Sequence, residues 1–205
     1  MACAVRAQQM KKARSQNGFT LIETLLVVAL IGVISVMAVP MMSNLIGNFR
    51  VTGDARTLSN SMAVAKMRAA ANFTRVRIYA DLTGQNYRME TWDKTAATWV
   101  TEAGATYLSS GVDFGYDIVP TPPPNTTGII DQPAKCTTDE GDEIDGTACI
   151  MFNSRGVPID TTSAPIVGAM YITDGEAVYA VSVASTGMMK SWQTYARSVP
   201  NWVMH

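Results

Sequence analysis

The sequence predicts an α+β protein in which one long N-terminal helix packs on an antiparallel, β-rich head. An apolar run over residues 25–42 is followed by apolar residues at helical spacing as far as Asn72. Beyond Asn72 the pattern changes to short alternating runs separated by glycine, asparagine and aspartate turn signals. With 205 residues, the chain is long enough for one medium domain and an anchor, and too short for two ordinary domains.

Charge divides the chain at Gly18. Four of the 16 basic residues precede Gly18 and no acidic residue does, which leaves 12 basic against 17 acidic side chains after it. The basic ones are Arg6, Lys11, Lys12 and Arg14. A mildly acidic remainder argues against broad nucleic-acid binding, which requires a basic surface.

Residues 19–42 are predicted to form a transmembrane helix. Their 24 residues would reach roughly 36 Å as a helix, enough to cross a hydrocarbon core of about 30 Å. The basic flank before them predicts a cytoplasmic N-terminus and a head outside the cytoplasm. Two alternatives are a simple signal anchor and a secretory signal peptide cleaved after Val36-Met37-Ala38. Against the signal peptide, the run is longer than usual and carries Glu23.

Glu23 is the unexpected residue of this segment. An ionised side chain at the centre of a membrane helix costs about 2.5 to 3.5 kcal/mol on insertion scales, so its presence indicates a function and a partner. A plain anchor has no use for it.

The residues Gly18-Phe19-Thr20-Leu21-Ile22-Glu23, with the basic leader before them and the apolar run after them, resemble the class III signal of type IV pilins and type II secretion pseudopilins. The resemblance implies a pilin fold and removal of leader residues 1–18 by prepilin peptidase, with N-methylation of Phe19. It also implies partners: other pilins, the peptidase/methyltransferase and an inner-membrane assembly platform. Gly32 and Pro40 fall where many members carry a glycine and a proline at which the helix loosens during assembly.

Elementary physics supports these roles. Pro40 removes a backbone donor and Gly32 weakens a helix by about 1 kcal/mol relative to alanine, so the stretch between them is the weakest of the helix. Glu23 lies four residues from Phe19, whose new amine would be cationic after cutting. In a filament, the Glu23 carboxylate can meet that amine on a neighbouring subunit and set the register.

The helix is expected to run from about Phe19 to Asn72, with residues 43–72 as an amphipathic half laid on the head. Its predicted core positions are Leu45, Phe49, Leu58, Met62 and Ala65, and Met67 is interpreted as core filler together with Met62. The head, residues 73–205, begins with four runs that predict a meander-like antiparallel sheet. These runs are residues 75–81, 87–92, 98–102 and 112–119.

Residues 120–128 are proline-rich and predict an irregular loop. Cys136 and Cys149 then bracket five carboxylates, and because this part should lie outside the cytoplasm a disulfide is predicted there, whereas Cys3 leaves with the leader. Calcium binding by this acidic loop is the alternative, although the loop lacks the ligand spacing of an EF-hand. A solvated loop and no metal site are the expectation.

The C-terminal strand-like runs and their glycine turns, up to Gly187, are similar to the end of the domain in the minor pseudopilin H and FimT family. These runs are 150–158, 169–175 and 177–183. Some FimT-like pilins bind DNA through a Gly-Arg-x-Arg motif, but both arginines are missing here at 187–190. Lys190, Trp192 and Arg197 remain weak DNA-binding candidates, and a tail whose aromatic residues pack on the sheet is favoured over them.

No catalytic set can be assembled, because the only histidine is the terminal His205 and no phosphate loop or zinc-ligand spacing is present. Neither an enzymatic activity nor a cofactor is predicted, and a membrane-anchored enzyme is the least supported reading. The sequence instead predicts a structural subunit, minor rather than major, of a pilus or secretion pseudopilus. Such a subunit is single-pass in the bacterial inner membrane with a periplasmic head before it joins the filament. The alternative is a DNA-binding or adhesive minor pilin of an uptake system.

Overall fold

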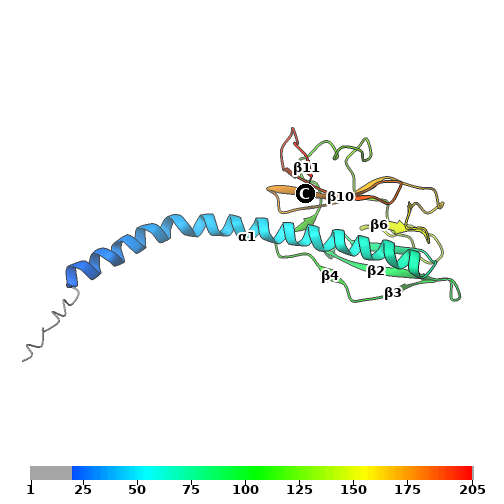
Figure 1. Ribbon diagram of the computed structural model, residues 1–205, viewed down its shortest axis with the longest axis horizontal. Coiled ribbons are helices and arrows are strands. Elements are labelled where there is room, and N and C mark those ends of the chain that lie inside the picture. Colours follow the sequence, from blue (N-terminus) through cyan, green and yellow to red (C-terminus); the bar gives the residue numbers. More distant parts are fainter. Residues whose placement is uncertain (1–19, 205) are drawn as a thin grey trace, which may run out of the picture. The chain divides into compact units, whose positions relative to one another are not determined.

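A computed structural model of the chain describes residues 20–204, except for the side chains of residue 37 and of residues 39–45. The chain divides into two compact units, residues 1–43 and 44–205. The helix α1 (Leu21–Ala71) supplies the first unit and enters the second, where two antiparallel sheets accompany it (Figure 1). The predicted α+β class, a long N-terminal helix with a β-rich head, is confirmed.

The buried face of α1 in the second unit consists of small and medium apolar side chains spaced three or four residues apart. These are Val51, Ala55, Leu58, Met62, Ala65 and Ala69. Leu58, Met62 and Ala65 were predicted correctly, but Phe49 is 75% exposed and Met67 is 62% exposed. Small residues at 55, 65 and 69 let the sheets approach the helix closely. Phe49 and Met67 each lie two residues from a member of the buried stripe, so both side chains project from another side of the helix.

The helix ends where Phe73 takes a left-handed backbone conformation with φ of 50°. The backbone N–H of Thr74 then donates to the carbonyl of Ala69 at 3.2 Å, which satisfies one of the last helical carbonyls. The chain reverses immediately into the first strand.

The first sheet has the strand order β3-β2-β1-β6-β7, and β4 also pairs with β2. Its centre is the antiparallel trio β2-β1-β6, in which Ile78 lies opposite Met89 on one side and Ile150 on the other. The strands are β1 (Val76–Asp81), β2 (Asn86–Asp93), β3 (Thr98–Thr101), β4 (Thr106–Tyr107), β6 (Thr147–Phe152) and β7 (Pro158–Ile159).

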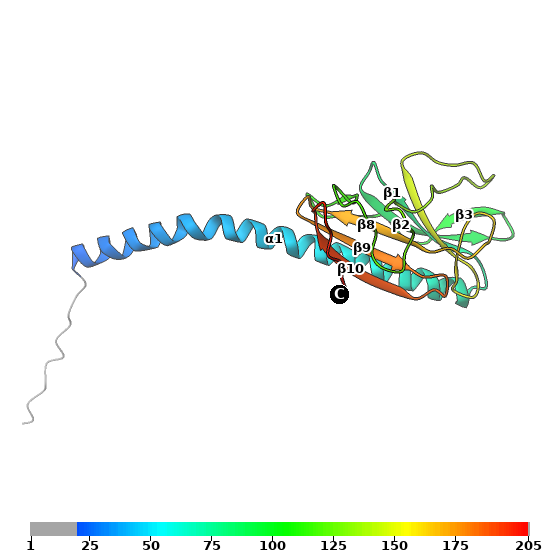
Figure 2. The ribbon, with the colours of Figure 1, turned by 90° about the horizontal axis from the view of Figure 1, so that it is seen from above.

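The second sheet has the order β11-β10-β9-β8-β5. Figure 2 shows its central strands β8, β9 and β10 side by side over the second half of α1. The strands are β5 (Asp113–Phe114), β8 (Gly168–Thr173), β9 (Ala177–Val183), β10 (Met189–Tyr195) and β11 (Val203–Met204).

One expectation about these strands is wrong. The run at 112–119 does not continue the first meander, because β5 pairs with β8 in the second sheet. The crossing is held by the Phe114 N–H, which donates to Gln85 Oε1 at 2.7 Å. The expected packing of C-terminal aromatic residues on a sheet is seen for Trp192 and Trp202 in the smaller core, and β10 in addition pairs with β9 along its whole length.

The core has two parts, one on each face of the second sheet. The larger lies between α1 and both sheets, and every residue of β9 is buried. The smaller lies on the opposite face, where Val119 and Ile130 from the ends of the proline-rich segment cover Tyr171, Val178 and Trp192. The predicted irregular loop therefore lies in a segment whose two ends cover one face of the second sheet.

Lys66 of α1 holds two glycine turns together. Its Nζ donates to the carbonyl of Gly187, in the turn between β9 and β10, at 2.8 Å. Its aliphatic stem passes Gly156, in the turn after β6, so closely that a Cβ there would lie 3.0 Å from Cγ. Both glycines have positive φ, 72° at Gly156 and 78° at Gly187. Since the turns belong to different sheets, Lys66 links the sheets to each other and to the helix.

Candidate functional site

Gly18 and Phe19, the predicted processing and methylation residues, lie outside the residues that the structure describes. The described chain begins with a helix cap. The backbone N–H of Glu23 reaches both the carbonyl of Thr20, at 3.1 Å, and its hydroxyl Oγ1, at 3.3 Å. Thr20 and Glu23 thus have the spacing of a capping box, and the Glu23 carboxylate lies in the first turn, where the helix dipole favours negative charge.

The apolar side chains after Glu23 are exposed in the single chain. They are Leu25, Leu26, Val27, Val28, Leu30, Ile31, Val33, Ile34 and Val36. A Cβ added at Gly32 would have no atom within 4 Å outside the backbone of its own helix. The Ser35 hydroxyl donates to the carbonyl of Ile31 at 2.8 Å. The helix continues unbroken through Gly32 and Pro40. A contiguous apolar surface of this extent indicates contact with lipid or with other helices.

Within the residues that are described, no helix is both long and apolar enough to cross a membrane. The predicted span, residues 19–42, includes Phe19 and several side chains from 37 onward that lie outside this description.

Cys136 and Cys149 form the predicted disulfide, with an S–S distance of 2.02 Å and Cα atoms 5.0 Å apart. Backbone contacts hold both ends of the bracketed loop. Cys149 N–H donates to the carbonyl of Ala134 at 2.8 Å, and Cys136 N–H donates to the Thr147 hydroxyl at 3.0 Å. The bridge therefore fixes residues 134–136 beside β6.

The carboxylates of the acidic loop are dispersed. Lys135 Nζ lies 2.7 Å from Asp145 and 3.5 Å from Glu143, and Asp139 accepts the Trp99 N–H at 2.8 Å. The hydrogen bond from Lys135 lowers the pKa of Asp145, and the same contact raises the pKa of Lys135. Among the described residues, no three His, Cys, Asp or Glu side chains are grouped to hold a metal ion. The alternative of a calcium loop gains no support from this geometry.

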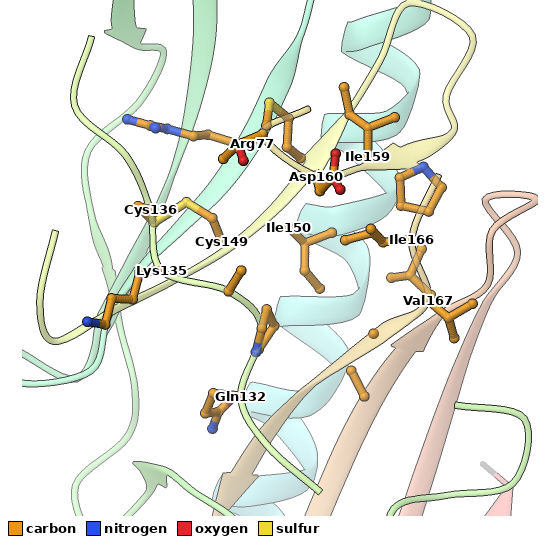
Figure 3. A pocket seen from close by; sticks show the side chains of 18 of the residues that line it. Arg77, Gln132, Lys135, Cys136, Cys149, Ile150, Ile159, Asp160, Ile166 and Val167 are labelled. Atoms are coloured by element: carbon orange, nitrogen blue, oxygen red, sulfur yellow. A yellow bond between two sulfur atoms is a disulfide. The ribbon is translucent and has the colours of Figure 1, made fainter. Parts of the chain in front are cut away.

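A cavity of about 410 Å³ opens between β6 and β8 (Figure 3). The disulfide forms part of one wall, Ile159 and Ile166 form the opposite wall, and Ile150 lies at the bottom with 1% exposure. The charged end of Lys135 points away from these aliphatic side chains. The cavity can therefore accept an apolar group.

Gln132 lines this cavity, and its side-chain amide bonds to the backbone of β8 as a neighbouring strand would. Its side-chain amide donates to the carbonyl of Tyr171 at 2.8 Å and accepts the Tyr171 N–H at 3.1 Å. These two bonds cover the edge of β8 beyond the reach of β5. The segment from Gln132 to Cys136 thus bridges the two sheets.

A buried charge network, which the sequence did not predict, lies on the outer face of the first sheet. Arg77 is 5% exposed, and its Nη2 lies 2.6 Å from Glu90 Oε2, whereas Arg88 Nε lies 2.7 Å from Glu90 Oε1. Burial lowers the pKa of Arg77, and Glu90 opposes that shift. The guanidinium of Arg77 also stacks 4.0 Å from the centroid of Trp99. One carboxylate thus holds two guanidiniums among aromatic rings.

The weak DNA-binding candidates do not form one surface of stacking rings. Trp192 is 7% exposed, packs in the smaller core, and donates its indole N–H to Ser182 Oγ at 2.9 Å. Lys190 lies 5.8 Å from the ring of Trp192, and Arg197 stacks on Tyr195 at 5.2 Å. A base cannot stack on a ring that is buried, so Trp192 acts in packing.

Comparison with known families matches residues 13–39 to the Prokaryotic N-terminal methylation motif. No curated protein and no solved structure matches the chain. The matched residues include Gly18, Phe19, Glu23 and Gly32 and end just before Pro40.

Proposed function

We propose that this chain, a prepilin of the type IV pilin and pseudopilin family by its N-terminal methylation motif, is a minor subunit cut after Gly18 and assembled through α1. The motif implies a processed prepilin, an N-terminal membrane anchor before assembly, and assembly with other pilins into a pilus or pseudopilus. The role of the chain is structural and not catalytic.

The observation that carries the proposal is the junction of the motif with the start of α1. Thr20 caps the helix and Glu23 lies in its first turn, directly before a helix surface that is apolar and exposed on the single chain. An exposed carboxylate followed by an uncovered apolar helix suits packing among like helices, where a cationic terminal amine can satisfy the charge.

A role as a minor subunit of the pseudopilin H and FimT type is supported by the pairing of the glycine turns. The turns at Gly156 and Gly187 are the pattern on which that resemblance depends, and they meet over Lys66. Because both turns lie against Lys66 of α1, one contact explains why glycine stands at two positions so far apart in the sequence.

The cut is tested by the mass of the mature N-terminus. Produced in cells that contain a prepilin peptidase, the wild-type chain should begin with N-methylated Phe19, whereas Gly18→Phe should retain its leader and stay in the membrane. Gln16→Leu, a change of similar size within the leader, should be cut normally. A shortened Gly18→Phe chain would refute the assignment of the cut.

The minor role is tested by abundance. Filaments sheared from cells that carry a tagged copy should contain the chain at a small fraction of the total pilin mass, measured by quantitative mass spectrometry. If it were instead the main component of those filaments, the proposal of a minor subunit would be wrong.

A further inference from the structure

A second cavity, of about 320 Å³, lies where α1 ends and the first sheet begins. We call it the Arg75 pocket, and three segments of the chain, residues 73–75, 92–94 and 153–163, form it. Its lining residues are Phe73, Thr74, Arg75, Trp92, Lys94, Asn153, Ser154, Ile159 and Ser163. Neither the methylation motif nor the assembly helix accounts for this set.

Backbone contacts fix the aromatic and cationic parts of the pocket side by side. The Trp92 N–H donates to the carbonyl of Arg75 at 2.9 Å, and the Thr74 hydroxyl donates to the carbonyl of Trp92 at 2.8 Å. The Arg75 guanidinium lies 4.6 Å from the centroid of the Trp92 ring. The guanidinium also lies 5.8 Å from the centroid of Trp99, and it forms no hydrogen bond or ion pair with another described residue, so its N–H fork can receive a planar anion.

The charge lining the pocket is entirely positive. Arg75 and Lys94 belong to no ion pair in the described part of the chain, and no carboxylate lines the cavity. Lys94 uses one of its three donors on the carbonyl of Phe73. The nearby carboxylates are engaged elsewhere, because Asp93 accepts the backbone N–H of Thr95 at 2.7 Å and Asp160 accepts three donors from its own loop.

The polar groups of the pocket are donors as well. Asn153 Oδ1 accepts the backbone N–H groups of Arg155, at 2.9 Å, and Val157, at 3.1 Å, which fixes the orientation of the amide. Its NH₂ group is thereby left as a donor with no protein acceptor in the described residues. The hydroxyls of Ser154 and Ser163 likewise have no protein partner there.

An oxyanion on a hydroxylated body that has an apolar face matches this composition. The guanidinium of Arg75 and the ammonium of Lys94 suit a carboxylate, the hydroxyls and the amide suit sugar hydroxyls, and the exposed ring of Phe73, which also lines the cavity, suits C–H groups. The volume is near the lower end of ligand sites, enough for one or two sugar units. Since the mature chain is acidic as a whole, such recognition is local and does not extend to long polyanions.

We propose that the Arg75 pocket binds an acidic sugar residue, a carboxylate-bearing unit of a surface polysaccharide, so that the subunit also recognises a glycan. This inference is independent of where the subunit lies in the filament. It adds a binding activity to a structural protein.

The test uses the full chain in detergent micelles with digalacturonate and N-acetylneuraminate as probes, followed by saturation-transfer NMR and calorimetry. At least one acidic sugar should bind, and neutral digalactose should not. Arg75→Gln and Lys94→Gln should each weaken binding by about tenfold, as expected for loss of a charge-assisted contact. Arg155→Gln, an exposed change in the adjoining turn that does not line the pocket, should bind as the wild type does.

Several results would overturn the proposal. These are binding of neither acidic sugar, equal binding of digalactose, equal loss in Arg155→Gln, or inorganic phosphate competing as well as the sugar does. Circular dichroism and the midpoint of thermal unfolding establish that each variant is folded. If Arg75→Gln does not fold, Lys94→Gln alone decides, because Lys94 is exposed and its substitution leaves the Trp92 contacts intact.

Discussion

The ammonium group of Lys66 and the carbonyl oxygen of Gly187 are 2.8 Å apart, and this contact joins the helix to a turn 121 residues later in the chain. Because the turn at Gly156 lies against the same side chain, one lysine aligns the ends of both sheets. The head is therefore held by a polar contact at its end as well as by the core beneath it.

Replacing Lys66 with methionine should keep the packing of the stem and remove the charged hydrogen bond. We expect the free energy of unfolding to fall by about 1.5 to 3 kcal/mol, the usual range for a hydrogen bond that involves a charged group. Urea unfolding followed by tryptophan fluorescence measures it. Arg56→Met, on an exposed position of the same helix, is the matched control and should change stability by less than about 0.5 kcal/mol; equal effects would contradict the role of Lys66.

Gly187→Ala should be more damaging. The residue has φ of 78°, and the added Cβ would lie 2.3 Å from the carbonyl oxygen of Gly156. We expect a loss of more than about 2 kcal/mol, since backbone strain and a steric clash combine. Gly104→Ala has open space around it and no positive φ, so its stability should be almost unchanged. A thermal midpoint of Gly187→Ala equal to that of Gly104→Ala would disprove the close approach.

The bridge between Cys136 and Cys149 should stabilise the head by about 3 kcal/mol in the chain-entropy model. Cys136→Ser combined with Cys149→Ser should lower the free energy of unfolding by that amount. Dithiothreitol should have a similar effect on the wild type and none on the double variant. If the reductant destabilised both proteins equally, its effect would have to arise elsewhere.

Glu90→Gln tests the buried network. Removing this carboxylate leaves Arg77 buried without a counter-charge, which costs about 3 to 5 kcal/mol. Glu176→Gln, at an exposed position whose side chain forms no hydrogen bond or ion pair with another described residue, serves as the control. Urea unfolding of the two variants should differ by most of that amount, and a difference under about 1 kcal/mol would mean that water reaches Arg77.

Glu23→Gln removes the charge but keeps the size of the side chain. Cutting should proceed normally, whereas incorporation into filaments should fall by about tenfold or more, because the terminal amine loses its partner. The mass of the membrane-bound protein and immunoblots of sheared filaments measure the two steps. Normal incorporation would remove Glu23 from the assembly contact.

The long elements of the fold could be predicted because their patterns are local. The apolar alternation of Val76, Ile78 and Ala80 in β1 and the apolar spacing of α1 around Met62 arise because these side chains face the larger core. The two-residue strand β5 could not be predicted to pair as it does, since its partner β8 is distant in the chain, with Asp113 opposite Thr173. Phe49 was misassigned for a different reason: it lies two residues before Val51, roughly 200° around the helix from the buried stripe, and is therefore exposed.

The burial of Arg77 could not be predicted from alternation alone. Alternation places Arg77 on the face of β1 opposite to Ile78, away from the larger core. The disulfide loop lies over that face, where Arg77 Nη1 donates to the carbonyl of Thr137 at 2.7 Å. Alternating arginines beside Trp92 and Trp99 were the available signal, because cations interleaved with indole rings favour stacking.

The cap at Thr20 has a consequence for maturation. The proposed cut falls two residues before it, so removal of the leader would leave both the capping hydroxyl and the first-turn carboxylate where they were. The helix α1 can then begin at the same residue in the membrane-anchored precursor and in the filament subunit. Proteolysis would then add one positive charge, on the new terminal amine of Phe19, directly before the first turn of a helix that it leaves unchanged.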